Sequence, residues 1–166
     1  MKSAALIATT LLAVLAGCQR PAEELFSVSG RIFVFNYRLA YAHYLVTLQR
    51  TAAVPEGMRY VARFENPAGG EALVAERKIF PAQEKLVIES PHVECVKKDR
   101  PYEVKVEIID GEGAVVQTVE TMVVSNLDQS VLPREPLVSG PAYEPNAGAR
   151  DSAGKIVMRD PANCPA

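Results

Sequence analysis

The sequence predicts an all-β domain, built as a sandwich of about seven strands. Between Ser27 and Asn126, apolar and polar residues alternate over short stretches, and no segment sustains a helical period. Turn residues separate these stretches, and seven strands within about a hundred residues are typical of a two-sheet sandwich. We therefore place the sandwich at residues 27–126 and a C-terminal tail at residues 127–166.

The strands follow from this alternation and from the turns between them. The clearest hairpin turns at Asp110-Gly111-Glu112-Gly113, where glycines permit the positive φ angles that such connections need. In the strand before this turn, Val104, Val106 and Ile108 alternate with charged residues, so one face is expected on the core and one in water. A second hairpin is expected at residues 66–70. The expected strands cover residues 30–37, 42–50, 59–65, 72–80, 85–89, 102–109 and 114–124.

The strand count and spacing resemble an immunoglobulin-like or fibronectin-type-III-like sandwich. In such domains a Tyr at the start of the sixth strand often closes a corner through its hydroxyl, and Tyr102 has that place. The chain has no Trp, and Cys95 precedes the sixth strand, so the antibody-type inter-sheet bridge is absent. The resemblance implies an architecture and no functional residue, and a transthyretin-like variant stays open.

The tail differs in composition from the sandwich. Proline fixes φ and lacks a backbone donor, which favours an extended path over the surface or disorder. Residues 146–160 are small and polar, and we expect them to be mobile. Half of the 12 prolines follow Asn126: Pro133, Pro136, Pro141, Pro145, Pro161 and Pro165.

The N-terminus has the pattern of a secretory signal peptide at residues 1–17. Lys2 precedes a short apolar run that ends in Leu15-Ala16-Gly17-Cys18. These four residues resemble the lipobox of bacterial lipoproteins, in which the thiol of the Cys receives diacylglycerol and the chain is cut before it. The resemblance implies that Cys18 is the lipid attachment site and that residues 18–26 form a tether to the membrane.

The resemblance also suggests a location. Lipoproteins that remain in the inner membrane commonly carry Asp after the lipidated Cys, whereas Gln19 stands here. We therefore expect a lipid-anchored protein on the periplasmic face of the outer membrane. An ordinary signal peptide, cut nearby and leaving Cys18 as a free thiol, is the alternative.

The cysteines and charges limit the partners. Cys95 and Cys164 are the remaining thiols, and an exported chain favours a disulfide between them. Closing a loop of roughly 70 residues contributes about 4 kcal/mol in the chain-entropy estimate. The net charge of −2 comes from interspersed signs, which argues against nucleic-acid binding and against a polybasic membrane patch. Contact with the membrane is therefore expected through the acyl groups at Cys18.

Catalytic patterns are weak, and we expect no enzyme, cofactor or metal site. The chain carries no nucleophile elbow, phosphate-binding glycine loop or His-Glu-x-x-His motif. His43 and His92 stand in contexts typical of ordinary histidines, and neither has a metal-like spacing from a Cys. Asp110 and Glu112 flank turn glycines, where turn geometry explains an Asp better than calcium binding does.

One strand indicates a partner. In residues 31–37, Phe33, Phe35 and Tyr37 alternate with Ile32 and Val34, so both faces are apolar although a sandwich buries only one. We take Phe33, Phe35 and Tyr37 as the candidate partner surface for another protein. The alternative is that the tail covers this aromatic row with apolar side chains. Those side chains are Leu132, Leu137, Val138 and Tyr143.

These observations predict a lipoprotein that acts as a non-catalytic structural or adaptor module and binds envelope proteins. The alternative from another class is a receptor for a small ligand such as a sugar, a peptide or a cell-wall fragment. Its site would lie in loops near Tyr41, Tyr44 and Tyr60. The lack of Trp weakens the sugar version, because aromatic platforms usually carry sugar stacking. An enzyme built from distant loops ranks third.

Overall fold

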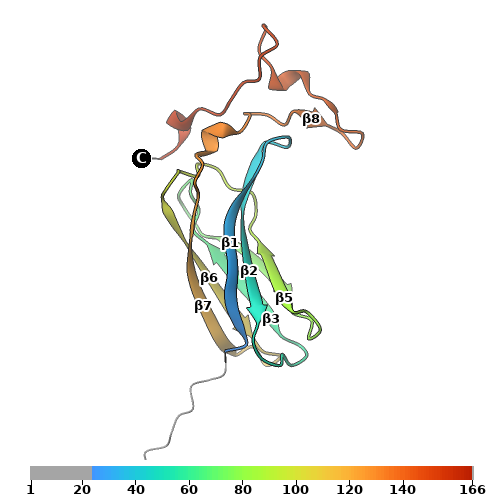
Figure 1. Ribbon diagram of the computed structural model, residues 1–166, viewed down its shortest axis with the longest axis vertical. Coiled ribbons are helices and arrows are strands. Elements are labelled where there is room, and N and C mark those ends of the chain that lie inside the picture. The colour runs from blue at the N-terminus through green and yellow to red at the C-terminus, as the bar shows by residue number, and fades with distance from the viewer. Residues whose placement is uncertain (1–23, 166) are drawn as a thin grey trace, which may run out of the picture.

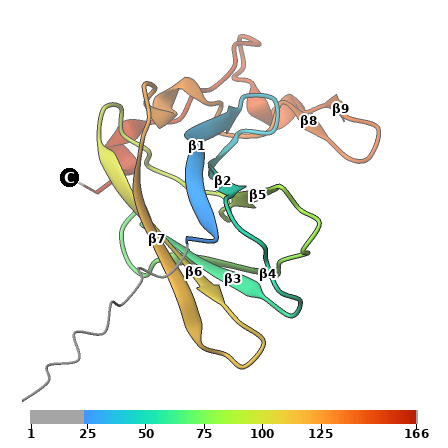
Figure 2. The ribbon, with the colours of Figure 1, turned by 60° about the horizontal axis from the view of Figure 1, so that its bottom comes forward.

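Two antiparallel sheets pack face to face, as the alternation predicted, and enclose one hydrophobic core (Figure 2). The computed structural model describes residues 24–165. The first sheet has the order β1-β2-β5 and the second the order β4-β3-β6-β7. The strand bounds are β1 Phe26–Asn36, β2 Tyr41–Arg50, β3 Arg59–Phe64, β4 Leu73–Lys78, β5 Lys85–Glu89, β6 Pro101–Ile109 and β7 Val115–Val124.

The topology confirms the immunoglobulin-like sandwich. In a constant-type immunoglobulin domain the fourth strand joins the sheet of the first, second and fifth strands. Here β4 pairs with β3 instead, which gives a three-stranded and a four-stranded sheet. This division differs from that of a constant-type immunoglobulin domain.

Aromatic rings fill the core between the sheets. Tyr44, Tyr102 and Phe64 are fully buried, and the ring of Phe33 lies 4.3 Å from that of Tyr44. The hydroxyl of Tyr102 accepts a hydrogen bond of 2.7 Å from the backbone N–H of Lys97, five residues earlier. Tyr102 therefore closes the corner before the sixth strand, as the sequence predicted.

The first strand is longer than the alternation indicated. β1 starts at Phe26, and its register shifts between Val28 and Gly30 because a bulge interrupts the pairing with β2. A bulge places one additional residue in a strand and breaks the alternation of faces. The part of β1 before Gly30 was missed for this reason. The remaining strands begin and end within two residues of their expected bounds.

Side chains close the gap between the edge strands β1 and β7. The backbone N–H groups of Leu25 and Phe26 both donate to Oε1 of Gln117, and Nε2 of Gln117 donates to the Phe26 carbonyl. Further along, the guanidinium of Arg31 donates to Oγ1 of Thr121 at 3.1 Å. A charged side chain on an edge strand also discourages pairing of that edge with another chain.

The tail lies across one end of the sandwich, beside the turn between β1 and β2 (Figure 1). Leu132 is fully buried in the core, and the backbone N–H of Leu137 donates to the carbonyl of Arg38. The tail contains the short elements η1 Gln129–Val131, β8 Val138–Ser139, β9 Glu144–Pro145, η2 Ala147–Ala149 and η3 Pro161–Asn163.

One sequence prediction about the tail is wrong. Residues 146–160 are folded: Arg150 and Ile156 form a bridge, and Ala149 is buried. Irregular hydrogen bonds hold this segment. The backbone N–H of Val157 donates to the Ala149 carbonyl, and the amide of Asn146 donates to the carbonyl of Pro136 and accepts from Gly148 N–H. The tail also caps the end of the sandwich (Figure 1), where Leu132 belongs to the same core cluster as Phe33, and the guanidinium of Arg38 lies over the ring of Tyr143.

The start of β1 lies at the end of the sandwich opposite the tail (Figure 1). The leader at residues 1–17, Cys18 and most of the tether at residues 18–26 lie outside the described residues. Within residues 24–165, no helix has the length and hydropathy needed to cross a bilayer.

Candidate functional site

The outer face of the four-stranded sheet is covered by ion pairs at its centre. Arg63 pairs with Glu107 at 2.8 Å, and Lys105 lies 3.7 Å from both Glu107 and Glu120. Towards β4, Arg59 pairs with Glu76 at 2.8 Å. Exposed pairs contribute little to stability, roughly 0–1 kcal/mol each, but they keep this face solvated.

The outer face of the three-stranded sheet is different, because none of the ion pairs between described residues lies on it. Its two charged positions on β5, Lys85 and Glu89, stand at the ends of that strand. Ile32 is 51% exposed and Val87 is 55% exposed. We call this surface the uncharged face; its central residues are Ile32, Val34, Leu45, Thr47 and Val87.

Three rings border the uncharged face near the tail. Tyr41 and His92 stack with ring centroids 3.9 Å apart, and the ring of His43 lies 5.7 Å from that of Tyr41. Burial lowers the pKa of His43 below its ordinary value; Glu89 opposes this shift and His92 adds to it. A largely neutral His43 extends the uncharged character of the surface.

The aromatic row of β1 faces the core, whereas the sequence predicted that it would face outward as a partner surface. Phe33 is buried, with its ring against Tyr44 and Tyr102, and Phe35 packs partly against the core. Of the three expected partner residues, Tyr37 is exposed, at the turn beyond β1. The larger rings fill the core, so Ile32 and Val34 face outward and become the apolar face in need of a partner.

The tyrosines proposed for a small-ligand site do not come together. Tyr44 and Tyr60 are buried core residues, and the hydroxyl of Tyr44 donates to the carbonyl of Glu65 at 2.7 Å. Tyr41 is half-buried on the other side of β2. The expected site near these three residues is therefore wrong, because strand alternation separates Tyr41 from Tyr44.

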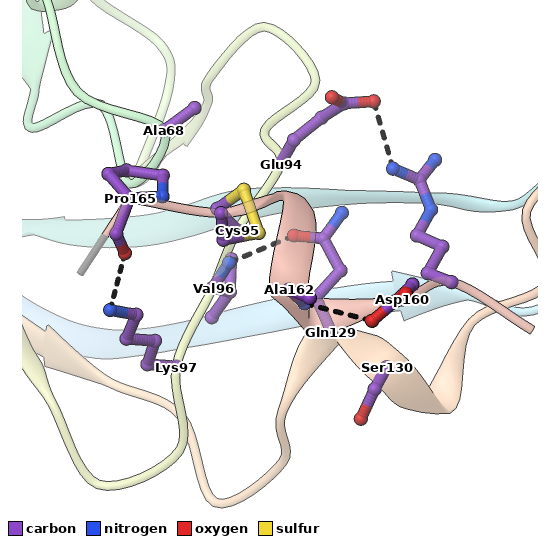
Figure 3. The surroundings of a disulfide bond; sticks show 12 residues. Ala68, Glu94, Cys95, Val96, Lys97, Gln129, Ser130, Asp160, Ala162 and Pro165 are labelled. Atoms are coloured by element: carbon purple, nitrogen blue, oxygen red, sulfur yellow. Dashed lines mark hydrogen bonds and ion pairs between the residues drawn. A yellow bond between two sulfur atoms is a disulfide. The ribbon is translucent and has the colours of Figure 1, made fainter.

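A disulfide holds the end of the tail. Cys95 and Cys164 are joined, as predicted, with their Cα atoms 5.4 Å apart (Figure 3). Beside them, Arg159 pairs with Glu94 at 2.8 Å, and Nζ of Lys97 donates to the carbonyl of Pro165 at 2.7 Å. These contacts tie the tail to the loop that precedes β6.

A buried glutamine joins the tail to the same loop. Oε1 of Gln129 accepts the backbone N–H of Val96 at 2.9 Å (Figure 3), and its Nε2 donates to the Val93 carbonyl at 3.0 Å. The backbone N–H of Gln129 donates to the Val96 carbonyl. This side chain gives no signal in the sequence, because Gln is normally a surface residue.

A cavity of about 700 Å³ lies between the tail and the loop before β6. Its walls include the disulfide and the exposed or half-buried cations Lys97, Lys98 and Arg134. Asp128 and Asp160 also line it, and each carboxylate caps a 3-10 helix by accepting a backbone N–H. Its mixed charges and its volume are suited to a small polar molecule.

The residues considered for metal binding have structural roles. Oδ1 of Asp110 accepts the backbone N–H groups of Glu112 and Ala114, which fixes the turn between β6 and β7. His43 and His92 belong to the ring cluster described above. Within residues 24–165, no group of three or more His, Cys, Asp and Glu side chains is placed to hold a metal ion.

Comparison with known proteins adds no identity to these features. No protein-family model matches the chain, and none of the curated proteins searched matches it.

Proposed function

We propose that the protein is an outer-membrane lipoprotein that acts as a non-catalytic adaptor, binding envelope proteins on the uncharged face. The observation that supports this proposal most directly is the contrast between the two outer faces of one sandwich. Interfaces are depleted of charged residues at their centre and rich in apolar and aromatic side chains. The centre of the uncharged face has this composition, whereas the centre of the opposite face carries ion pairs, and exposed apolar residues of that sheet, such as Val74, Met122 and Val124, lie on its edge strands.

The lipobox at Leu15-Ala16-Gly17-Cys18 supplies the second part of the proposal. Acyl chains on Cys18 would hold the tether at the membrane, since each buried methylene contributes about 0.8 kcal/mol. The described chain starts at the end of the sandwich opposite the tail (Figure 1). The uncharged face runs along the side between these two ends and is accessible from the periplasm in this arrangement.

Crosslinking in intact cells tests the proposal. Proteins joined to the acylated chain are identified by mass spectrometry and compared with those joined to Cys18→Ser. An adaptor predicts specific envelope proteins that are lost from the Cys18→Ser sample. An unchanged set of proteins, or none from correctly anchored material, would contradict the proposal.

The cavity beside the disulfide favours a second candidate, a receptor for a small ligand. Its position differs from the tyrosine site that the sequence indicated. It combines cations with carboxylates, which suits a zwitterionic molecule such as a short peptide. Calorimetric titration with short peptides and with sugars distinguishes this candidate, and Arg134→Ala should weaken peptide binding if the cavity is the site.

A further inference from the structure

Each sheet of the sandwich has two edge strands, and two of these four edges protect each other. β1 and β7 lie side by side and are bridged by Gln117 and Arg31. β4 and β5 are the other edges. Unpaired edges are templates for pairing with another chain, and natural proteins protect them with charges or cover.

The backbone of β5 offers hydrogen-bonding groups at its open side. Arg50 N–H donates to the Glu84 carbonyl at 2.9 Å, and Ser90 N–H donates to the Tyr44 carbonyl at 3.2 Å. In an antiparallel pair, the backbone N–H and C=O groups of every second residue point towards the partner strand. Those of the even-numbered residues from Glu84 to Ser90 therefore point towards β2. The N–H and C=O groups of Lys85, Val87 and Glu89 therefore point away from the sheet. In residues 24–165 no backbone group pairs with them.

The side chains along the β5 edge are complementary in charge to the same side chains of a second copy. We propose that the protein forms a symmetric dimer in which β5 pairs antiparallel with β5 of a second copy, centred on Val87. Val87 then faces the second Val87, and Lys85 faces Glu89 in two symmetry-related pairs. Opposite charges directly across two strands stabilise pairing. A two-fold interface requires this self-complementarity.

The edge of β4 has the opposite property. Ile79 N–H donates to the Met58 carbonyl, so the backbone groups of Val74, Glu76 and Lys78 face outward by the same alternation. Pairing of two β4 strands about their centre would place Glu76 against Glu76, and like charges directly opposite are destabilising. The two open edges therefore differ in whether they admit a second copy.

Dimerisation through β5 would join the uncharged faces of two copies, with a Lys85–Glu89 pair on each side of the central Val87 residues. The two three-stranded sheets join into one six-stranded sheet, and Val87 of both copies lies at its centre, beside Thr47 of each copy. The long axes of the two copies then run in opposite directions. Pairing of so short a strand covers less area than a standard interface of about 1,600 Å², so a reversible dimer is expected. This inference does not depend on the lipid anchor or on an envelope partner.

Disulfide trapping tests the pairing. Facing residues of a hydrogen-bonded antiparallel pair have Cα atoms about 5.5 Å apart, which is within disulfide range. The purified full-length Val87→Cys protein is incubated in a glutathione redox buffer, and the covalent dimer is followed on non-reducing gels. Glu76→Cys on the β4 edge is the matched control. We expect the covalent dimer to form at least tenfold faster with Val87→Cys.

Charge reversal makes the test specific. Adding Lys85→Glu to Val87→Cys should reduce the rate to that of the control, because the introduced carboxylate would face Glu89 of the second copy. Adding Lys85→Glu and Glu89→Lys together should restore it, since the charges complement again. Equal rates for Val87→Cys and Glu76→Cys, no effect of Lys85→Glu, or no recovery in the double reversal would each overturn the proposal.

Discussion

The carboxamide of Gln117 pairs with the backbone of Phe26 in both directions, accepting its N–H at 3.0 Å and donating to its carbonyl at 2.6 Å. A side chain of β7 thus takes the place of a neighbouring strand for β1. The two sheets are joined at this edge without a continuous backbone ladder.

Replacing Gln117 should therefore loosen the start of β1. We expect Gln117→Ala to lower the free energy of unfolding by about 1–3 kcal/mol, because partly buried backbone groups of Leu25 and Phe26 lose their partners. Chemical denaturation measures the loss. The nearby exposed Thr118→Ala is the control, with a change within about 0.5 kcal/mol. Equal effects of the two substitutions would show that the pairing is unimportant.

Gln129 should matter more than its residue type suggests. Gln129→Leu keeps the approximate volume but leaves Val96 N–H and the Val93 carbonyl unpaired. We expect a loss of about 2–4 kcal/mol, since unsatisfied buried polar groups cost about 1–3 kcal/mol each. Comparing the thermal unfolding of Gln129→Leu with that of Gln129→Glu separates the contributions of the two hydrogen bonds. Glu keeps the acceptor for the N–H of Val96 but loses the donor for the Val93 carbonyl. A Gln129→Leu protein as stable as the native chain would refute this role.

The disulfide should protect the tail more than the sandwich. Cys95→Ser with Cys164→Ser removes a link worth up to about 4 kcal/mol in the chain-entropy estimate. Hydrogen exchange should become faster in residues 150–165. Core strands such as β6 should keep the same ranking of protection against exchange. Leu132 and Gln129 continue to hold the start of the tail. Uniformly faster exchange in all strands would contradict this division.

Buried tyrosines should make the protein sensitive to alkali. Burial raises the pKa of Tyr44 far above its ordinary value, helped by Glu65 and Tyr102 and opposed by Arg100. A group with a raised pKa in the folded state stabilises the protein below its unfolded pKa of about 10 and loses this contribution as pH rises. The free energy of unfolding should therefore fall above about pH 10.

Tyr44→Phe provides the control for this pH dependence. It loses the hydrogen bond to the Glu65 carbonyl, so it should be about 1 kcal/mol less stable at neutral pH. Above about pH 10 its stability should decline less steeply, by up to about 1.36 kcal/mol per pH unit. Parallel pH profiles for the two proteins would show that Tyr44 does not cause the dependence.

Sequence patterns predicted the sandwich well, because the alternation of apolar and polar residues shows directly which face of a strand is buried. Val104, Val106 and Ile108 are buried as expected, and the turn at Asp110 has the predicted place. In β1 both faces are apolar, so alternation alone could not decide which one enters the core. Phe33 fills more of the core than Ile32 would, and packing determined the outcome.

The candidate site was predictable only in part. The disulfide followed from the even number of remaining thiols and the expected compartment, independent of geometry. The uncharged face combines Ile32, Leu45 and Val87 from three strands, and their proximity depends on the strand order. That order is not visible in the residues of any one strand. The folded tail was missed because its hydrogen bonds, from backbone and side chains alike, join residues without a regular period.

Position-specific crosslinking tests the central claim, that envelope proteins bind on the uncharged face. A photoreactive amino acid is placed at Ile32 on that face or at Lys105 on the opposite face, in the anchored full-length chain in cells. The account predicts defined adducts with envelope proteins from position 32, and few from position 105. Equal adducts from both positions, or adducts from position 105 alone, would contradict it.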